Sequence, residues 1–299
     1  MDMLHITNLK KRFGDKAVLK ELELSVPEHS IFGFIGRNGA GKTTTMKAIL
    51  GLLRVDQGEI YVAGEKVIFG ETRTNRYVGY LPDVPEFYSF MTAPEYLKLC
   101  GECSEMKKPE IEARSRELLR LVGLSEEKRR IRGFSRGMKQ RLGIAQALLV
   151  RPKLLICDEP TSALDPLGRK EILDVLLACR EQTTVLFSTH ILADAERICS
   201  DVAFLNDGKI AVQGTVAELK KRHCTEEFSV EIINERDKKQ LLQRFSDASA
   251  AEKDTLVFAG GENRMFEILS FIAEHQISVR RIERVEPSLE SLFMEVAAK

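Results

Sequence analysis

The sequence has no long apolar run, no net charge and only one pair of closely spaced cysteines. No stretch of its 299 residues approaches about 18 uninterrupted apolar residues, so we expect no membrane-spanning helix. Residues 1–5, MDMLH, are neither basic nor apolar, which argues against a secretory signal peptide. The formal net charge is +0, and the small basic excess within residues 1–224 gives no argument for nucleic-acid binding.

The six cysteines are scattered along the chain, which fits a reducing cytosol. Cys100 and Cys103 form one C-x-x-C, but a zinc site of this type needs a second such pair, and the sequence has none. We therefore interpret these two residues as ordinary cysteines near a helix end.

The strongest motif is a glycine-rich loop with the sequence GRNGAGKTT at residues 36–44. It fits G-x-x-x-x-G-K-[ST]; a strand-like apolar run (31–35) precedes it and a helical pattern (45–50) follows. Glycines allow successive N–H groups to point inward as an anion nest, and the helix adds the positive end of its dipole. The strand–loop–helix context therefore predicts a nucleoside triphosphate site rather than a glycine-rich loop without chemistry.

Single residues of the loop have expected roles. Lys42 supplies a mobile charge for the β- and γ-phosphates, and the hydroxyl of Thr43 is placed to ligate Mg²⁺. Thr44 can donate to another phosphate oxygen. The other residues expected to bind the triphosphate are Gly36, Asn38, Gly39, Ala40 and Gly41.

The segments before the loop predict an antiparallel β layer. Apolar residues alternate from Leu4 to Val26, with a turn at Phe13 and Gly14, and Pro27 ends the set. We expect this layer to lie beside an α/β core. Phe13 could return to stack on a purine ring or be a core or edge aromatic, and its spacing leaves both interpretations open.

The segments after the loop predict an α/β fold with a parallel sheet. Residues 84–150 are mainly helical in pattern and include a capping box at Thr92 and Glu95 and a helix expected at 138–150. Strand-like and helical segments then alternate, which is typical of parallel strands joined by crossover helices. Residues 203–212 read as a hairpin with an Asp-Gly turn.

The end of the chain has a different character. From about Cys224 the pattern follows the order β-α-β-α-β-α with a net negative charge, which predicts a small separate α+β domain without a catalytic constellation. Since the length predicts one large domain or two unequal ones, we place domains at 1–222 and 223–299. The helical subdomain is expected at about 84–150.

Two adjacent acids, Asp158 and Glu159, follow an apolar strand-like segment. In phosphate-loop enzymes a strand-end carboxylate holds Mg²⁺, usually through water, and Asp158 is the candidate. Glu159 would project towards the γ-phosphate and could polarise the attacking water. An isolated pair of acids would be interpreted as a helix cap or a solvated pair. The phosphate loop earlier in the chain instead favours a role for the two acids in the nucleotide site. His190, at the end of the next strand, could contact the γ-phosphate, although a lone histidine is more often structural.

Taken together, these motifs resemble the nucleotide-binding subunit of an ABC transporter over about residues 3–222. Beside the phosphate loop, the motifs that carry the resemblance are YLPD (80–83), FSRGMKQ (134–140), DEPTS (158–162), LD (164–165) and STH (188–190). The tail, EPSLESLF at 286–293, resembles the accessory domain at the end of drug- and antibiotic-exporter ATPases.

The resemblance implies an ATPase that uses ATP and Mg²⁺ to power a transporter, with export favoured over import. It implies that Phe13 stacks on adenine, that Glu159 is the base and that His190 is the switch. The implied partners are a multi-span permease, which would hold the chain at the cytoplasmic face of the membrane, and a second copy of the chain.

In the implied homodimer, two ATP molecules are sandwiched head to tail, so hydrolysis requires dimerisation. Ser135 and Gly137 would cap the γ-phosphate of the nucleotide held by the other copy, from the start of a helix. Asp165 would lie across the dimer interface.

Two motifs depart from the family pattern. The usual signature is Leu-Ser-Gly-Gly-Gln; here Arg136 replaces the first glycine and Met138 replaces the glutamine. Ser135 and Gly137 remain, so the phosphate contact should survive. Asp83 stands where a glutamine or glutamate is usual. It is a candidate contact for nucleotide and Mg²⁺, but it is shorter than glutamine and charged, so the loop could instead serve mainly as a hinge.

Residues 87–91, FYSFM, are unusually apolar for a junction between a loop and a helix. In the family, a groove at this place receives a short coupling helix from the membrane partner. We hypothesise that these aromatic residues line the groove; the alternative is burial within the helical subdomain.

Two other functions compete with the transporter interpretation. One is a soluble ATPase of the same superfamily that acts on nucleic acid or ribosomes. Such proteins typically carry coiled-coil insertions, zinc modules or two ATPase cassettes, and this sequence has none, so we expect no nucleic-acid partner. The other is a nucleotide sensor that does not hydrolyse ATP, and the presence of both Glu159 and His190 argues against it.

Overall fold

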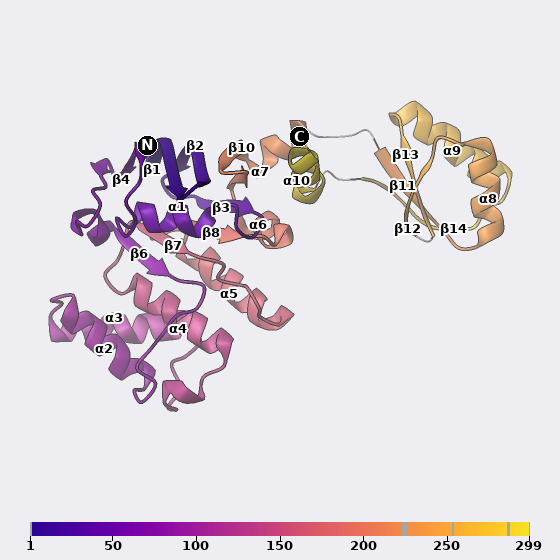
Figure 1. Cartoon of the computed structure of the whole chain (residues 1–299). Helices are drawn as coiled ribbons and strands as arrows, with labels where there is room; N and C mark the ends of the chain where they lie inside the picture. Colours follow the sequence, from indigo (N-terminus) through magenta and orange to yellow (C-terminus); the bar gives the residue numbers. More distant parts are fainter. Residues whose placement is uncertain (1, 223–226, 253, 286–287, 299) are drawn as a thin grey trace. The chain divides into compact units, whose positions relative to one another are not determined.

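The computed structural model describes residues 2–222, 227–252, 254–285 and 288–298. The chain forms two compact units (Figure 1). Unit 1 comprises Met1–Ala217 and Phe293–Lys299, and unit 2 comprises Glu218–Leu292. The domain boundary expected after residue 222 adjoins residues 223–226, which lie outside the described residues, as do Glu286 and Pro287 of the tail motif.

The antiparallel layer of unit 1 is formed as the alternating pattern predicts. Its strands run in the order β2-β1-β4-β5. Their bounds are β1 Asp2–Phe13, β2 Lys16–Pro27, β4 Gln57–Val62 and β5 Glu65–Lys66. Leu4 and Ile6 are fully buried on the same face of β1, because alternate side chains of a strand point to the same side.

The second sheet of unit 1 confirms the predicted α/β class. Its order is β10-β9-β3-β8-β7-β6, with parallel pairing from β9 through to β6. The strands are β3 Ile31–Gly36, β6 Val78–Leu81, β7 Leu154–Cys157, β8 Thr184–Thr189, β9 Asp201–Asn206 and β10 Lys209–Thr215. Strands β3, β7 and β8 are buried along their whole length. Because they run parallel, the loops that follow their carboxyl ends lie at the same edge of the sheet.

Strands β9 and β10 form the predicted hairpin with antiparallel pairing. Asp207 and Gly208 at its tip have φ of 44° and 76°. Positive φ at both central residues is what a two-residue turn between twisted strands requires, and Asp-Gly meets that requirement.

Helix α1, Lys42–Ile49, joins the two sheets of unit 1. Its buried residues Met46, Ala48 and Ile49 belong to one apolar core together with residues of both sheets, such as Leu4 and Phe34. This packing fixes the amino end of α1, and with it the phosphate loop, at the carboxyl edge of the parallel sheet.

The short helix η1 directly precedes β6, and the helical segment follows β6 after a loop; helices α2, α3 and α4 lie together in Figure 1. The bounds are η1 Arg73–Tyr77, α2 Ala93–Cys103, α3 Lys108–Leu121, η2 Ile131–Gly133 and α4 Arg136–Leu148. The capping box is present: the Thr92 amide donates to Glu95 Oε2 at 2.8 Å. Helix α4 begins and ends two residues earlier than the predicted 138–150. It begins at Arg136 because Ser135 caps it by accepting a hydrogen bond from the Met138 amide.

The remaining helices of unit 1 cross between parallel strands or follow the hairpin. They are α5 Pro166–Cys179, α6 Leu192–Ile198 and α7 Val216–Arg222, the last of which ends within unit 2. Among the described residues, no helix is sufficiently long and apolar to cross a bilayer.

Unit 2 is a small α+β domain with an antiparallel sheet in the order β12-β13-β11-β14. Its elements are β11 Glu227–Ile232, α8 Glu235–Arg244, β12 Ser249–Glu252, β13 Thr255–Ala259, α9 Glu262–Glu274 and β14 Val279–Arg284. The order β-α-β-β-α-β is the ferredoxin-like topology. The sequence pattern missed β12, because this strand is short and carries one alanine pair instead of an apolar alternation.

The final helix, α10 Leu289–Ala298, begins in unit 2, and its residues from Phe293 onwards belong to unit 1. Within unit 1, the ring of Phe293 lies against that of Phe204 in β9, with centroids 5.7 Å apart.

Candidate functional site

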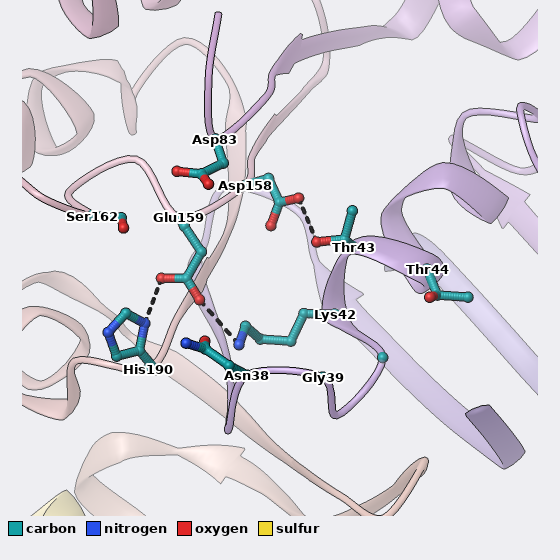
Figure 2. A pocket seen from close by; sticks show the side chains of 11 residues that line it. Asn38, Gly39, Lys42, Thr43, Thr44, Asp83, Asp158, Glu159, Ser162 and His190 are labelled. Carbon is teal, nitrogen blue, oxygen red and sulfur yellow. Dashed lines mark hydrogen bonds and ion pairs between the residues drawn. The ribbon is translucent and has the colours of Figure 1, made fainter. Parts of the chain in front are cut away.

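A polar cavity of about 340 Å³ lies at the carboxyl edge of the parallel sheet. Figure 2 shows the side chains that converge on it from the loop after β3, the loop after β6, and the ends of β7 and β8. The lining residues are Asn38, Gly39, Gly41, Lys42, Thr43, Thr44, Asp83, Asp158, Glu159, Ser162 and His190.

The phosphate loop curls as its glycines permit. Gly39 and Gly41 have φ of 81° and 114°, which side-chain-bearing residues rarely adopt. At Gly36, a Cβ would lie 2.8 Å from the carbonyl oxygen of Leu205, so only glycine fits where β3 meets β9. Helix α1 begins directly after Gly41, and its amino end therefore adds unpaired N–H groups and a positive dipole to the cavity.

Lys42 is held over the loop by its own backbone and by an acid. Its Nζ atom donates to the carbonyl oxygens of Gly36 at 2.7 Å and Arg37 at 3.2 Å. The same atom lies 3.0 Å from Oε1 of Glu159. The Lys42 side chain is 6% exposed. Because charges attract more strongly where water is excluded, an anion in the cavity would interact strongly with its ammonium group.

Thr43, Asp158 and Ser188 form a chain of hydrogen bonds at the base of the cavity. Thr43 Oγ1 donates to Asp158 Oδ2 at 2.7 Å, and Ser188 Oγ donates to Asp158 Oδ1 at 2.7 Å. Ser188 also accepts a hydrogen bond of 2.9 Å from the backbone amide of Glu159. One buried hydroxyl of β8 therefore fixes both acids that follow β7.

Glu159 and His190 form an ion pair or hydrogen bond at the mouth of the cavity (Figure 2). His190 Nδ1 lies 2.8 Å from Glu159 Oε2. An ionised carboxylate only accepts hydrogen bonds, so Nδ1 carries the proton when Glu159 is charged. Glu159 also has a positive φ of 48°, an uncommon conformation that turns the chain directly after the strand.

Asp83 lines the same cavity from the loop after β6. Its Oδ1 atom accepts a hydrogen bond of 3.2 Å from Arg136 Nη2, and its backbone oxygen accepts one of 2.6 Å from Gln140. Burial raises the pKa of the Asp83 carboxyl and the nearby acids Asp158 and Glu159 raise it further, whereas Arg136 opposes the rise.

The other residues predicted from the sequence lie outside this cavity. Ser135 is the exposed cap of α4, and Gly137 follows it in the first turn. Asp165 caps α5 by accepting from the amide of Gly168. Phe13 is half exposed at the end of β1, with Lys11 Nζ 5.3 Å from the centre of its ring. Gly36 and Ala40 belong to the loop but do not line the cavity.

Sequence reasoning missed two residues of the site. Ser162 lines the cavity, and Ser188 holds both acids. Both lie within motifs that were recognised, at one position after Thr161 and two positions before His190. Only the three-dimensional structure shows that these two serines, among the residues of their motifs, contribute to the site.

The fold and this site define a phosphate-loop nucleoside triphosphatase. A family model described as ABC transporter matches residues 19–162, and one described as the C-terminal domain of ATP-binding protein DrrA1-3-like matches residues 214–297. The chain is 38% identical over 304 residues to the ABC transporter ATP-binding protein YxlF of Bacillus subtilis, covering 98% of this chain and 99% of that protein. The chain therefore belongs to the family of ABC transporter ATP-binding proteins.

Two further relatives have more specific names. The bacitracin transport ATP-binding protein BcrA of Bacillus licheniformis is 34% identical, covering 98% of this chain and 97% of BcrA. The linearmycin resistance ATP-binding protein LnrL of Bacillus subtilis is 31% identical, covering 99% of both chains.

A solved structure of an ATP-binding subunit of an ABC transporter superposes with a TM-score of 0.65 at 33% identity, covering 74% of this chain and 92% of that one. Members of the family bind ATP and hydrolyse it to power transport, so this chain is an ATPase subunit of an ABC transporter. These findings confirm the predicted fold and function, and they lend no support to the nucleic-acid alternative.

Proposed function

We propose that two copies of this chain bind ATP and Mg²⁺ between them and drive a separate membrane permease that exports antibiotics. The observation that supports export is the similarity along nearly the whole chain, C-terminal domain included, to proteins named for bacitracin transport and linearmycin resistance. The permease would hold the chain at the cytoplasmic face of the membrane.

Thr43 and Asp158 would hold Mg²⁺. Their oxygen atoms lie 2.7 Å apart, and hard oxygen donors of this kind suit the ion, with phosphates and water completing its ligands. When bound, the ion neutralises charge on the phosphates. Asp83 faces the same cavity, but its Oδ1 atom already accepts from Arg136, so we assign it no direct coordination.

Glu159 would act as the base for the attacking water. Its carboxylate lies among a cationic lysine, a histidine and the amino end of α1, where a triphosphate would place its γ-phosphate. Lys42 would exchange its contacts with backbone carbonyls for phosphate oxygens, which are stronger acceptors because they are charged. His190 could donate to a phosphate oxygen only from Nε2, and this requires the protonated imidazolium while Nδ1–H faces Glu159.

The signature motif supports a composite site made by two chains. Ser135 is exposed and does not line the cavity of its own chain, so the N–H groups at the start of α4 would be available to a nucleotide held by a second copy. Gly137 lies beside the loop before α5: a Cβ there would be 3.9 Å from Leu164, the residue before Asp165. This proximity supports the proposal that the motif and Asp165 would face the second copy together.

The apolar run before α2 would receive the permease. Tyr88 and Phe90 are 57% and 60% exposed, and their rings lie 5.9 Å apart. Val84, on the same loop, is also exposed. Phe87 packs edge-on against Tyr96 of α2, with ring centroids 5.1 Å apart. The ring of Tyr88 also lies near Tyr96, at 6.4 Å, but Phe87 is only partly exposed, so its contact is internal to the helical segment. We therefore assign docking to Val84, Tyr88 and Phe90.

Co-purification tests the partner, and drug sensitivity tests the direction of transport. A tagged chain should be recovered from detergent-solubilised membranes together with a multi-span protein. A strain lacking the chain should become more sensitive to bacitracin or linearmycin, and the parent chain should restore growth, whereas Lys42→Ala should not. Recovery with ribosomes or DNA instead, or unchanged sensitivity to both drugs together with uptake of a solute, would contradict the proposal.

A further inference from the structure

Asp83 and Arg136 occupy two of the three positions at which this chain departs from the ABC family pattern, and the structure brings them together. Arg136 Nη2 lies 3.2 Å from Asp83 Oδ1, with side chains 42% and 47% exposed. A surface ion pair of this kind contributes little to stability. The significance of the pair therefore lies in what it connects.

Gln140 forms a second link between the same two segments. It is fully buried, and its Nε2 atom donates to the backbone oxygen of Asp83 at 2.6 Å. Because Gln140 follows Arg136 by four residues, both side chains leave the same face of α4. Helix α4 thus contacts the main chain and the side chain of Asp83 at once.

Helix α4 packs closely against the end of β6. A Cβ at Gly143 would lie 2.4 Å from Leu81 Cδ1, so the helix and the strand end approach as closely as glycine allows. Asp83 follows Leu81 by two residues. A displacement of Asp83 would therefore displace α4 as well.

The pair connects the ATP cavity with the signature motif at the start of α4. Asp83 lines the ATP cavity of its own chain, beside Asp158 and Glu159. Arg136 stands between Ser135 and Gly137, which in the proposed homodimer contact the ATP of the other chain. We propose that Asp83 and Arg136 are positioning residues that couple the two ATP sites of the dimer through each chain. This inference rests on the proposed homodimer.

The coupling has a simple electrostatic cause. ATP with its magnesium ion carries net negative charge, so binding beside Asp83 increases the attraction on the Arg136 guanidinium in a partly desolvated place. The guanidinium carries the first turn of α4 with it. ATP in one cavity then stabilises the orientation of the signature motif that serves the other cavity, which is positive cooperativity.

A double-mutant cycle tests the pair with the full-length chain. The variants are Asp83→Asn, Arg136→Gln and both together, with Arg132→Gln as a control that removes an exposed arginine of η2. Two quantities are measured: the Hill coefficient of ATP hydrolysis, and ATP-dependent dimerisation in a Glu159→Gln background by light scattering.

We expect a Hill coefficient above one for the parent and for the control. Each single variant should lower it to about one and raise the ATP concentration for half-maximal dimerisation by about tenfold. The double variant should do no more than either single, because one interaction has been removed in all three. Arg136→Lys, which keeps the charge, should restore part of the cooperativity.

Additive effects of the two single variants, or a dimerising parent with a Hill coefficient of one, would overturn the coupling. The homodimer itself is tested by Ser135→Arg, which should abolish dimerisation. If Ser135→Arg abolishes dimerisation while the cycle is additive, only the coupling is wrong. If Ser135→Arg changes nothing, the homodimer is wrong and the coupling falls with it.

Discussion

His190 Nδ1 lies 2.8 Å from one carboxylate oxygen of Glu159, and Lys42 Nζ lies 3.0 Å from the other. The three side chains come from the ends of two strands and the start of α1, and Figure 2 shows them pointing toward one another. The acid is thus oriented from both sides. Residues that act as one unit give non-additive effects when they are replaced, so the effects of single substitutions at these three residues will not sum.

Glu159→Gln should stop hydrolysis while leaving ATP bound. Removing a general base typically costs about 10²- to 10⁴-fold in rate. The neutral amide also ends the ion pair with Lys42, so the lysine is free for phosphate and ATP affinity should not fall. Steady-state ATPase assays and binding of a fluorescent ATP analogue measure the two quantities, and the trapped dimer should be seen by gel filtration. Hydrolysis at the parent rate would remove Glu159 from the role of base.

Lys42→Ala should lose ATP binding and remain monomeric. The ammonium group is almost fully buried, and a hydrogen bond to a charged partner contributes about 1.5 to 3 kcal/mol, which is roughly 10- to 150-fold in affinity. Lys47→Ala, on the exposed side of the same helix, is the matched control and should bind ATP as the parent does. Calorimetric titration with ATP distinguishes the two variants. Equal affinities for both would show that the loop does not use Lys42.

His190→Ala should lower kcat by about 10²-fold with a small change in KM. The imidazole orients Glu159, so its loss disturbs the transition state more than the bound substrate. His190→Gln keeps a donor and should retain more activity than alanine. A loss of ATP affinity equal to the loss of kcat would instead assign His190 to ground-state binding.

The sequence predicts the parts of the site that depend on local pattern. The phosphate loop, the capping box at Thr92 and the Asp-Gly hairpin each follow from neighbouring residues, because backbone conformation there is decided by glycine, proline or a capping side chain. The contact of Arg136 with Asp83 could not be predicted, because the two residues are far apart in the sequence and meet only through the packing of α4 on β6.

The role of Ser188 was hidden for a related reason. A serine in a buried strand is usually interpreted as a small core residue. The neighbouring residues in the sequence do not indicate that its hydroxyl contacts two acids at the end of another strand. The short strand β12 was missed because it has no apolar alternation and is held by pairing with β13. Non-local hydrogen bonds decide both cases.

Ser188→Ala should lower both stability and turnover. It leaves the amide of Glu159 and one oxygen of Asp158 without their partner, and an unsatisfied buried polar group costs about 1 to 3 kcal/mol. The acids would also lose their fixed orientation, so kcat should fall. Ser89→Ala, at an exposed serine, is the control for the stability measurement. Urea unfolding and ATPase assays give the two values; an unchanged unfolding midpoint would show that water replaces the hydroxyl.

Replacing Tyr88 and Phe90 together by serine should uncouple the chain from its permease. Both rings are exposed, so the double variant should fold, bind ATP and retain the ATPase activity of the isolated chain. Co-purification with the membrane partner, and restoration of drug resistance, should be lost. The physical reason is that large aromatic side chains at the centre of an interface contribute most of its binding energy, with about 2 kcal/mol or more for each such residue.

Phe87→Ser separates docking from folding. Phe87 packs against Tyr96 inside the helical segment, so serine should lower the melting temperature, whereas the exposed pair should leave it nearly unchanged. Thermal unfolding and pull-down from membranes are measured for all variants. If the Tyr88 and Phe90 variant unfolds early and loses ATP binding, the two rings belong to the core of the subdomain. If it is stable and still recovers the permease, the docking surface lies elsewhere on the chain.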